Sequence, residues 1–260
     1  MSESYELYAL RYAHHAPRPA SENFLDGDPH ETGSPLDYFV WLARNGERTI
    51  LIDLGFTPEA AARRGRTFLR SPLEGLRVLG IDPQAIDTVI VTHFHYDHVG
   101  NHAAFPNARF HIQDREMAYA TGRHMTHPRL RAAYDPDDVA ALVRAAYAER
   151  VIFHDGDWQA APGVGVALIG GHTLGLQIVR VATARGNVVI ASDAMHLYAN
   201  AAQSRPFPIV HDVGAMIEGW RRARELADSD AHVVPGHDPL VMERYTQVDE
   251  HIADLAQSPR

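Results

Sequence analysis

Residues 92–101 of this chain read THFHYDHVGN, and four side chains in this stretch commonly bind metal ions: His93, His95, Asp97 and His98. His93 and His95 lie two residues apart, so in an extended segment they point to the same side. Asp97 and His98 follow where we expect the chain to turn into a helix, and they can reach a second position nearby. Such a segment predicts a site for two metal ions. Nitrogen and oxygen ligands without sulfur suit Zn(II), and Mn, Fe or Co also fit.

Five short apolar runs along the chain each end near a residue that can bind or support a metal ion. The predicted buried strands are Thr49–Ile52, Thr88–Val91, Val164–Ile169, Val188–Ala191 and His232–Val234. The residues that follow them are Asp53, Thr92 with His93, His172, Ser192 with Asp193, and His237. If these strands lie side by side, their ends meet at one edge and the polar side chains form a cluster. The repeated pattern therefore indicates a metal centre.

The composition excludes several other kinds of site. The chain has 260 residues, of which 45% are apolar and 22% charged, as is ordinary for a folded protein. It contains no cysteine, and its 24 basic residues are all arginine. Disulfides, thiolate nucleophiles, iron–sulfur clusters and Schiff-base lysines are therefore excluded. No serine lies in a G-x-S-x-G frame, which argues against a serine hydrolase of the α/β-hydrolase type. A net charge of −9 argues against nucleic acid as a partner.

The rest of the chain mixes predicted strands and helices. Further strands are expected at Tyr5–Leu10, Tyr38–Ala43 and Gln177–Val181. Apolar residues at helical spacing predict one helix that begins at Pro136, after Asp135, and another that begins after Asp212. The polar, proline-rich segment Ala13–Pro35 is expected to be a long loop. This mixture indicates an α/β or α+β layered fold.

The sequence has no feature typical of export or of a membrane protein. The N-terminus lacks the basic start and apolar core of a signal peptide. No stretch approaches the ~18 consecutive apolar residues that cross a membrane. We therefore expect a cytoplasmic protein that has no membrane partner.

The motifs of this chain resemble those of the metallo-β-lactamase-fold hydrolases, and among them most closely those of the N-acyl homoserine lactonases. They are the His-x-His-x-Asp-His run from His93 to His98, Gly-Gly-His172-Thr, Ser-Asp193 and Pro-Gly-His237. The resemblance extends from Asp53 to His237 and so covers nearly the whole chain. It implies one domain over residues 1–260, an α/β (α+β) fold built as a four-layered αββα sandwich, and two metal ions at one edge of the two sheets.

The resemblance also implies a role for each of these residues. The ligands of the first metal ion correspond to His93, His95 and His172, and those of the second to Asp97, His98 and His237. Asp193 corresponds to the carboxylate that bridges both metal ions. Asp53 corresponds to an aspartate that supports the site from behind, because a ligating histidine usually donates its other N–H to such a group.

The implied reaction is hydrolysis of a lactone, most simply an N-acyl homoserine lactone or a related lactone. Two metal ions roughly 3.5–4 Å apart share a water and lower its pKa toward about 7, so the attacking group is a metal-bridging hydroxide. Asp97 and Asp193 act in catalysis through these metals. Lactonases of this family carry a tyrosine three residues after the bridging aspartate, where this chain has His196. We expect His196 to donate a proton or hydrogen bond in its place, with Tyr198 as the alternative.

Other features of the substrate stay open at this point. A metal-dependent thioesterase or esterase of the glyoxalase-II-like type, acting on another small acyl substrate, uses a similar ligand set. Flanking loops are expected to select the substrate, and Met117, Met125 and Phe207 are candidates to line the pocket. The resemblance further implies a homodimer.

Overall fold

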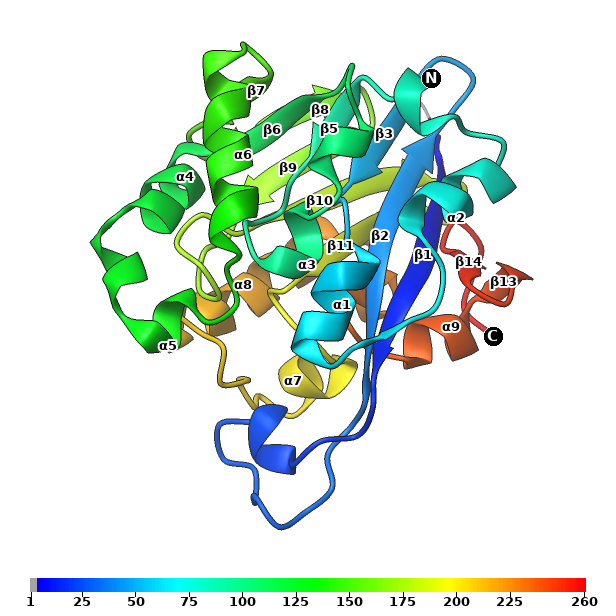
Figure 1. Ribbon diagram of the computed structural model, residues 1–260. Coiled ribbons are helices and arrows are strands. Elements are labelled where there is room, and N and C mark those ends of the chain that lie inside the picture. Colours follow the sequence, from blue (N-terminus) through cyan, green and yellow to red (C-terminus); the bar gives the residue numbers. More distant parts are fainter. Residues whose placement is uncertain (1–3) are drawn as a thin grey trace.

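The computed structural model describes residues 4–260 and contains two β-sheets with helices on their outer faces (Figure 1). The strands of the first sheet are β1 (Glu6–His15), β2 (Leu36–Arg44), β3 (Thr49–Ile52), β4 (Thr67–Phe68), β5 (Thr88–Ile90), β6 (Arg109–Gln113), β7 (Val151–His154), β13 (Thr246–Asp249) and β14 (Ile252–Asp254). Their order is β13-β14-β1-β2-β3-β5-β6-β7, with β4 paired to β1. The strands of the second sheet are β8 (Trp158–Ala161), β9 (Val164–Leu168), β10 (Gln177–Thr183), β11 (Gly186–Ser192) and β12 (Val233–Pro235). Their order is β12-β11-β10-β9-β8.

Helices cover the outer face of each sheet. The first sheet is covered by α1 (Pro58–Arg64), α2 (Pro72–Val78), α3 (Tyr96–Val99), α4 (Asp114–Thr121) and α6 (Pro136–Tyr147). The second sheet is covered by α7 (Tyr198–Ala202) and α8 (Val213–Leu226). The remaining helices are α5 (Pro128–Arg131), which follows α4, and α9 (Leu240–Arg244), which packs into the core between the sheets. Single-turn 3-10 helices lie at Ala20–Glu22, Pro83–Ala85, His102–Ala104, Arg123–Thr126 and Asp230–His232.

Each sheet separates two apolar cores because its central strands are buried on both faces. In β2, the even-numbered residues from Tyr38 to Leu42 pack beneath the helices of the first sheet. The odd-numbered residues from Phe39 to Ala43 pack against the second sheet. Residues of β11 divide in the same way between the inter-sheet core and the core beneath α8. Three cores between four layers confirm the predicted αββα sandwich.

The predicted elements near the site are confirmed to within a few residues, and so are the two predicted helix starts. The side chain of Asp135 accepts a hydrogen bond from the backbone of Asp137, and the side chain of Asp212 accepts one from the backbone of Ala215. The strands β4, β6, β7, β8, β13 and β14 were not predicted. Most are short or carry polar and partly exposed residues, so apolar periodicity does not identify them.

The predicted loop Ala13–Pro35 is wrong at its start. The strand β1 continues to His15, because Ala13 and His14 pair with β4 and the segment from Ala13 to His15 pairs with β2. Only the part that follows is a loop, with one 3-10 turn inside it. Across residues 4–260, no helix is long and apolar enough to span a membrane.

The strand ends meet at one edge as predicted, but they come from both sheets. The strands β3 and β5 are parallel neighbours in the first sheet, and β11 and β12 are parallel neighbours in the second. Gln177, at the start of β10, joins the two sheets at this edge. Its backbone N–H donates to the carbonyl of Thr92 at 3.0 Å, and its side-chain amide donates to the carbonyl of Val91 at 2.8 Å. Residues about 85 positions apart in sequence therefore lie side by side.

The backbone at this edge adopts conformations that most residues avoid. Asp53 has a φ of 62° and Ser192 a φ of 45°, and such conformations cost about 1–3 kcal/mol each unless the surroundings hold them. Gly236 is required for a different reason, because a Cβ there would lie 2.7 Å from Oδ1 of Asp193. Close approach of the chain before His237 to the Asp193 carboxylate therefore needs glycine at this position.

Candidate metal centre

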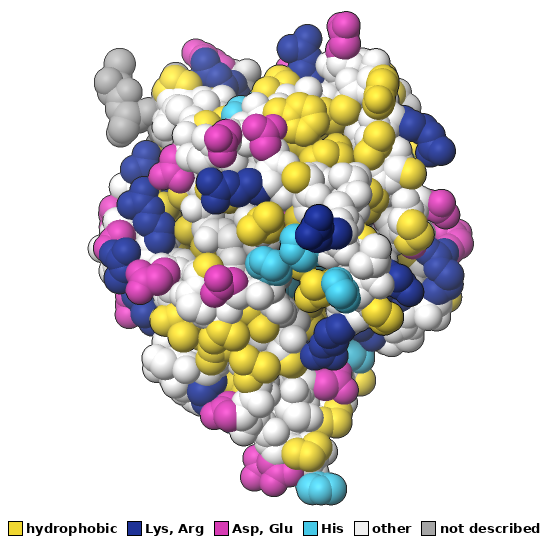
Figure 2. Space-filling model, turned by 90° about the vertical axis from the view of Figure 1, so that its left-hand side faces the viewer, with side chains coloured by type: hydrophobic (Ala, Val, Ile, Leu, Met, Phe, Trp, Pro, Cys, Tyr) yellow, Lys and Arg dark blue, Asp and Glu magenta, His cyan; other side chains and the backbone are white. Residues whose placement is uncertain are grey.

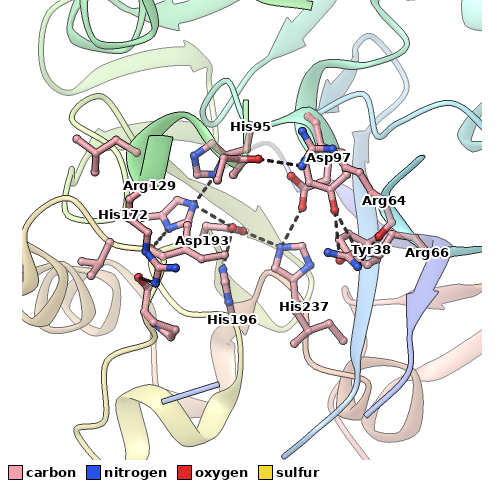
Figure 3. Close-up of a pocket in the computed structure, with 18 of the residues that line it drawn as sticks. Tyr38, Arg64, Arg66, His95, Asp97, Arg129, His172, Asp193, His196 and His237 are labelled. Atoms are coloured by element: carbon pink, nitrogen blue, oxygen red, sulfur yellow. Dashed lines mark hydrogen bonds and ion pairs between the residues drawn. The ribbon is translucent and has the colours of Figure 1, made fainter. Parts of the chain in front are cut away.

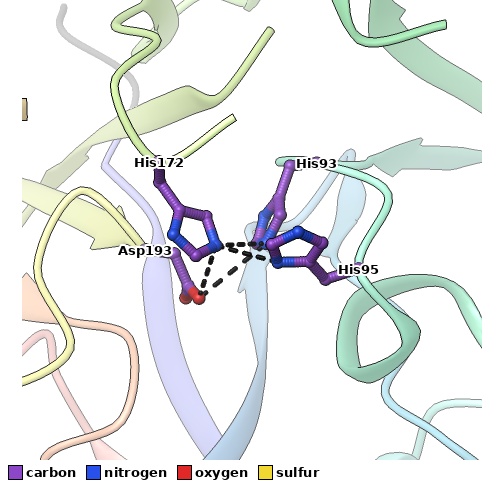
Figure 4. Close-up of side chains that lie close together, drawn as sticks. All are labelled: His93, His95, His172 and Asp193. Carbon is purple, nitrogen blue, oxygen red and sulfur yellow. Dashed lines mark hydrogen bonds and ion pairs between the residues drawn. The ribbon is translucent and has the colours of Figure 1, made fainter. Parts of the chain in front are cut away.

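Three imidazole nitrogens converge at the floor of a cavity at this edge (Figure 4). Nε2 of His93 lies 3.1 Å from Nδ1 of His95, and Nε2 of His172 lies 3.2 Å and 2.9 Å from those two atoms. Nitrogens bound to one zinc ion at 2.0–2.1 Å stand roughly 3.3 Å apart in tetrahedral geometry. The spacing of the three atoms thus fits a common metal ion.

A second group of ligand atoms lies beside the first. Nε2 of His237 is 3.7 Å from Oδ2 of Asp97, and Nε2 of His98 is 3.8 Å from the same oxygen. Asp193 lies between the two groups. Its Oδ2 is 3.2 Å from His172 Nε2, whereas its Oδ1 is 3.1 Å from His237 Nε2 and 3.5 Å from His98 Nε2. One carboxylate therefore presents one oxygen to each group, as Figure 3 shows for His172 and His237.

The unpaired atoms of the cluster fit bound cations. His98 Nε2 and Asp193 Oδ1 are buried and form no hydrogen bond. Burial alone would lower the pKa of His98, but the carboxylates of Asp53, Asp97 and Asp193 outweigh it and raise that pKa to about 10. This shift reflects the negative charge of three carboxylates around the buried ring, which a bound cation would offset. Neutral imidazoles and ionised carboxylates are the forms that bind metal.

The protonation states of the first group suit metal binding. Burial, followed by the neighbouring imidazoles, lowers the pKa of His93 and of His95 well below the usual range, so both rings are neutral. Burial alone would raise the pKa of Asp193, but His237, His196 and His98 lower it well below its usual value, so this carboxylate is ionised. The structure thus brings together all seven residues predicted as ligands.

Asp53 supports the ligands from behind, through hydrogen bonds to two neighbours. Its Oδ2 lies 2.7 Å from Nδ1 of His98, which leaves Nε2 of that ring toward the second group. The same carboxylate accepts from the backbone N–H of Thr92 at 2.7 Å and from its hydroxyl at 2.8 Å. The Thr92 hydroxyl also lies 2.9 Å from that of Ser192, next to Asp193. These contacts couple the ends of three strands.

Glu116 on α4 is a supporting residue that the sequence analysis missed. Its carboxylate is fully buried and accepts four hydrogen bonds. The donors are the backbone N–H of Phe94 (2.9 Å), the backbone N–H of Gly175 (3.1 Å), the hydroxyl of Thr173 (2.7 Å) and the hydroxyl of Tyr134 (3.1 Å). Phe94 separates His93 from His95, and Thr173 follows His172. One carboxylate thus holds both loops that carry the first group. The signal in the sequence is an acidic residue on the same helical face as the buried Tyr119 and Ala120.

His196 lies at the cluster, and Tyr198 does not. Nε2 of His196 is 3.0 Å from Oδ2 of Asp193, and its ring stacks on Phe207 with a centroid distance of 3.6 Å. Burial lowers the pKa of His196 to about 3, so the ring is neutral at pH 7. The ring of Tyr198 instead packs against the inter-sheet core, with the guanidinium of Arg244 4.0 Å from its centroid. The structure therefore contradicts the alternative role for Tyr198: its side chain leaves α7 on the side away from the metal ligands.

The cavity above the cluster has a volume of about 210 Å³ and is lined by polar as well as apolar residues. Of the three predicted pocket residues, Phe207 is fully buried and forms the support for His196. Met117 and Met125 pack against the core under the helices of the first sheet, and neither lines this cavity. The prediction that these three residues line the cavity is therefore wrong: Met117 on α4 packs on that core, Met125 in the 3-10 turn Arg123–Thr126 lines a neighbouring pocket, and Phe207 lies behind His196. Tyr38, Tyr119 and several arginines line the cavity instead.

Known proteins share both this fold and this sequence pattern. The family model of the metallo-beta-lactamase superfamily matches residues 33–237. An N-acyl homoserine lactonase from Bacillus sp is 27% identical over 225 residues, which cover 79% of this chain and 84% of that protein. The crystal structure of a quorum-quenching N-acyl homoserine lactone lactonase superposes with a TM-score of 0.76 at 21% identity, covering 92% of this chain and 95% of that one. AidC, a dizinc quorum-quenching lactonase in complex with a product, superposes with a TM-score of 0.71 at 18% identity, covering 97% and 93% of the two chains. The predicted resemblance is confirmed, and this chain belongs to the metallo-β-lactamase superfamily.

Proposed function

We propose that this protein is a dinuclear metal-dependent hydrolase that opens lactone rings, such as N-acyl homoserine lactones or related lactones. The observation that carries the proposal is the position of Asp193, whose two carboxylate oxygens face two separate groups of ligand atoms. A carboxylate shared in this way holds a pair of metal ions. The similarity to N-acyl homoserine lactonases supports the lactone ring as the bond that is attacked.

We propose Zn(II) as the native metal, with Mn, Fe or Co as substitutes that the same ligands accept. The nitrogen and oxygen ligands and the name of the dizinc relative support this choice. When bound, the two ions supply an activated water at neutral pH and polarise the ester carbonyl. His93, His95 and His172 would hold one ion, Asp97, His98 and His237 would hold the other, and Asp193 would serve both. A homodimer and a cytoplasmic location stay predictions from the sequence.

Residues around the metal ligands orient the reacting groups, and the alkoxide formed on ring opening takes up a proton. His196 lines the cavity, and the single N–H of its neutral ring donates from Nε2 to Oδ2 of Asp193 at 3.0 Å, so the ring orients that carboxylate beside the reacting ester. Stacking on Phe207 holds the ring in that place. When the ring opens, the ring oxygen of the lactone becomes an alkoxide in the same molecule as the new carboxylate. This alkoxide takes up a proton, which completes the reaction.

The test is turnover of a substrate panel by the metal-loaded protein, followed by acid release in a pH-stat. The panel holds short- and long-chain N-acyl homoserine lactones, simple γ- and δ-lactones, an aryl ester and a glutathione thioester. We expect lactones to be hydrolysed fastest, with activity lost on chelation and restored by Zn(II), and about two metal ions per chain. Faster turnover of the thioester than of every lactone would contradict the proposal and favour a glyoxalase-II-like activity.

Replacing His196 by alanine is expected to lower kcat for lactones by about 10- to 100-fold, because the hydrogen bond that orients the Asp193 carboxylate is lost. The metal content should stay at the wild-type value, since His196 is not among the seven ligands. Tyr198→Phe is the matched control, and it should keep wild-type kcat because the ring of Tyr198 packs away from the cavity. Full turnover by His196→Ala, measured with the same lactone, would remove His196 from the reaction.

A further inference from the structure

The substrate cavity carries an unusual concentration of arginine for a protein with a net charge of −9. Four of its lining residues are arginines, and they come from three separate parts of the chain: Arg18, Arg64, Arg66 and Arg129. Figure 3 shows Arg64 and Arg66 on the side of Tyr38 and Arg129 on the side of His172. Figure 2 shows histidine and arginine side chains gathered near the middle of one face of the molecule. The acidic residues of the cavity wall are Asp97 and Asp193, and both belong to the metal cluster.

Arg18 is buried, although its charge is almost without a partner. Its side chain is 9% exposed, and its Nε and Nη2 atoms are buried without any hydrogen bond. The nearest carboxylate among the described residues is that of Glu22, 3.7 Å away on a half-exposed side chain. Burial, and then the charge of the neighbouring Arg66, disfavour the guanidinium and lower its pKa. A buried guanidinium that has two nitrogen atoms without hydrogen-bond partners and belongs to a cavity wall is suited to bind an anion.

Arg66 is held in place by neutral partners only. Its Nε donates to the hydroxyl of Tyr96 at 3.2 Å, and its Nη1 donates to the carbonyl of Arg64 at 2.8 Å. Nη1 also lies 3.2 Å from Nε2 of His15, whose pKa falls to about 4 through burial and the nearby arginines, so that this ring accepts. These contacts fix the direction of the guanidinium without neutralising it. Arg64 is likewise held by the carbonyls of Ala132 and Tyr134.

The positive charge of this wall is therefore only partly balanced: outside the metal cluster, the carboxylate within 4 Å of it among residues 4–260 is that of Glu22, beside Arg18. Two divalent ions at the floor would add further positive charge, which Asp97 and Asp193 only partly offset. A neutral substrate would leave Arg18 and Arg66 desolvated and repelling each other. At about 210 Å³ the cavity is also smaller than the roughly 300–1,000 Å³ of common ligand pockets, which favours a compact substrate.

We propose that the substrate of this enzyme is a small lactone that carries an oxyanion, a carboxylate or a phosphate, and that Arg18 and Arg66 bind this group. The inference rests on the proposed lactone hydrolysis and specifies its substrate class. The guanidiniums of Arg18 and Arg66 meet the anion, while the ester lies over the metal ligands. Arg129, which is exposed and donates to the carbonyl of Pro208 at 3.3 Å, stands at the rim, where it attracts the charged substrate.

The test compares two lactones of nearly equal shape with the metal-loaded protein. One is 5-oxotetrahydrofuran-2-carboxylate, and the other is its neutral primary amide. We expect kcat/KM for the carboxylate to exceed that for the amide, and that for N-hexanoyl homoserine lactone, by about 10- to 100-fold, the usual weight of a charged hydrogen bond. Equal turnover of carboxylate and amide by the wild-type protein would overturn the inference while leaving the proposed lactonase activity intact.

Variants then test whether the preference for the carboxylate over the amide depends on Arg18. Arg18→Gln should lower the ratio of the two kcat/KM values toward one, and Arg18→Lys should restore part of it because the charge returns. A loss of structure would lower both values and leave the ratio unchanged. Arg63→Gln is the matched control: Arg63 lies on α1 next to Arg64, is 61% exposed and does not line the cavity, so the ratio should not change.

Binding of small anions tests the role of Arg18 without any need for turnover. Succinate and inorganic phosphate are titrated calorimetrically into the metal-loaded wild-type protein and into Arg18→Gln. We expect each anion that fits the site to bind about 10- to 100-fold more weakly to the variant, and the stronger of the two identifies the kind of oxyanion. If no lactone of the panel is hydrolysed, the proposed function fails, and this titration alone decides the inference. Equal affinity of both proteins for both anions overturns it.

Discussion

Asp193→Asn is expected to lower kcat/KM for lactone hydrolysis by at least about 10³-fold, or roughly 4 kcal/mol of transition-state stabilisation. The carboxylate presents Oδ2 to His172 and Oδ1 to His237 and His98, so it serves both groups of ligands. An amide carries no charge and can bind metal only through its single oxygen. Two cations would then lie close together without the negative charge between them. Metal analysis after dialysis should find about one equivalent or less in place of about two.

The comparison needs a second aspartate variant that lies outside the cluster. Asp249 on β13 forms an ion pair with Arg70 and is remote from the metal ligands. Asp249→Asn should keep both metal equivalents and the wild-type rate, whatever it does to stability. If Asp193→Asn instead retained both metal ions and a rate within tenfold of wild type, the site could not be built around a bridging carboxylate.

Glu116→Gln is expected to destabilise the protein by about 3–5 kcal/mol and to weaken binding of the first metal ion by about 10- to 100-fold. All four partners of Glu116 are donors, and two of them are the backbone N–H groups of Phe94 and Gly175. The NH₂ group of glutamine cannot accept, so buried donors on the two ligand loops lose their partner. A fall of roughly 6–20 °C in Tm should follow for a chain of this size. Calorimetry and competition with a metal-binding dye measure the two effects.

The dependence of activity on Zn(II) concentration shows whether Glu116 positions the metal ligands or only stabilises the fold. The activity of Glu116→Gln should recover as the concentration of Zn(II) rises, because the ligands themselves are intact. Tyr134→Phe is the matched control, since it removes one of the four donors and leaves no buried acceptor without a bond at Glu116. It should cost about 1 kcal/mol and keep near-wild-type metal affinity. Glu116→Gln that matched Tyr134→Phe in both measurements would show that Glu116 does not hold the ligand loops.

Much of the metal centre could be predicted from the sequence because its ligands follow directly on apolar strands. The run from His93 to His98 is dense enough to indicate two metal positions by itself, and Asp53 and Asp193 stand at the ends of buried runs. The helix starts at Asp135 and Asp212 could be predicted because an aspartate at the N-cap acts on backbone groups only two or three residues away. Local patterns of this kind do not depend on the rest of the chain.

The direction of individual side chains could not be predicted in this way. Met117 and Tyr198 were reasonable pocket or catalytic residues from their positions in the sequence, yet both turn toward an apolar core. Conversely, Glu116 and Arg18 carry no motif: Glu116 acts through contacts with distant segments, and Arg18 through its place in the cavity wall. Arg18 lies in a loop whose sequence shows only that it is polar and rich in proline.

The sequence by itself thus determined the layered fold, and it predicted the seven candidate ligands and a metal bound by nitrogen and oxygen, because alternating burial and ligand chemistry are properties of single segments. Only the tertiary structure decided which oxygen of Asp193 faces which ligand group, and which carboxylate supports the loops. It also decided that four arginines, of which Arg18 alone has a carboxylate within 4 Å, line the cavity above the metal cluster. The reason is physical: these properties arise where two sheets and their connecting loops pack together, and the unpaired charge of a buried side chain is defined only by the neighbours that packing brings to it.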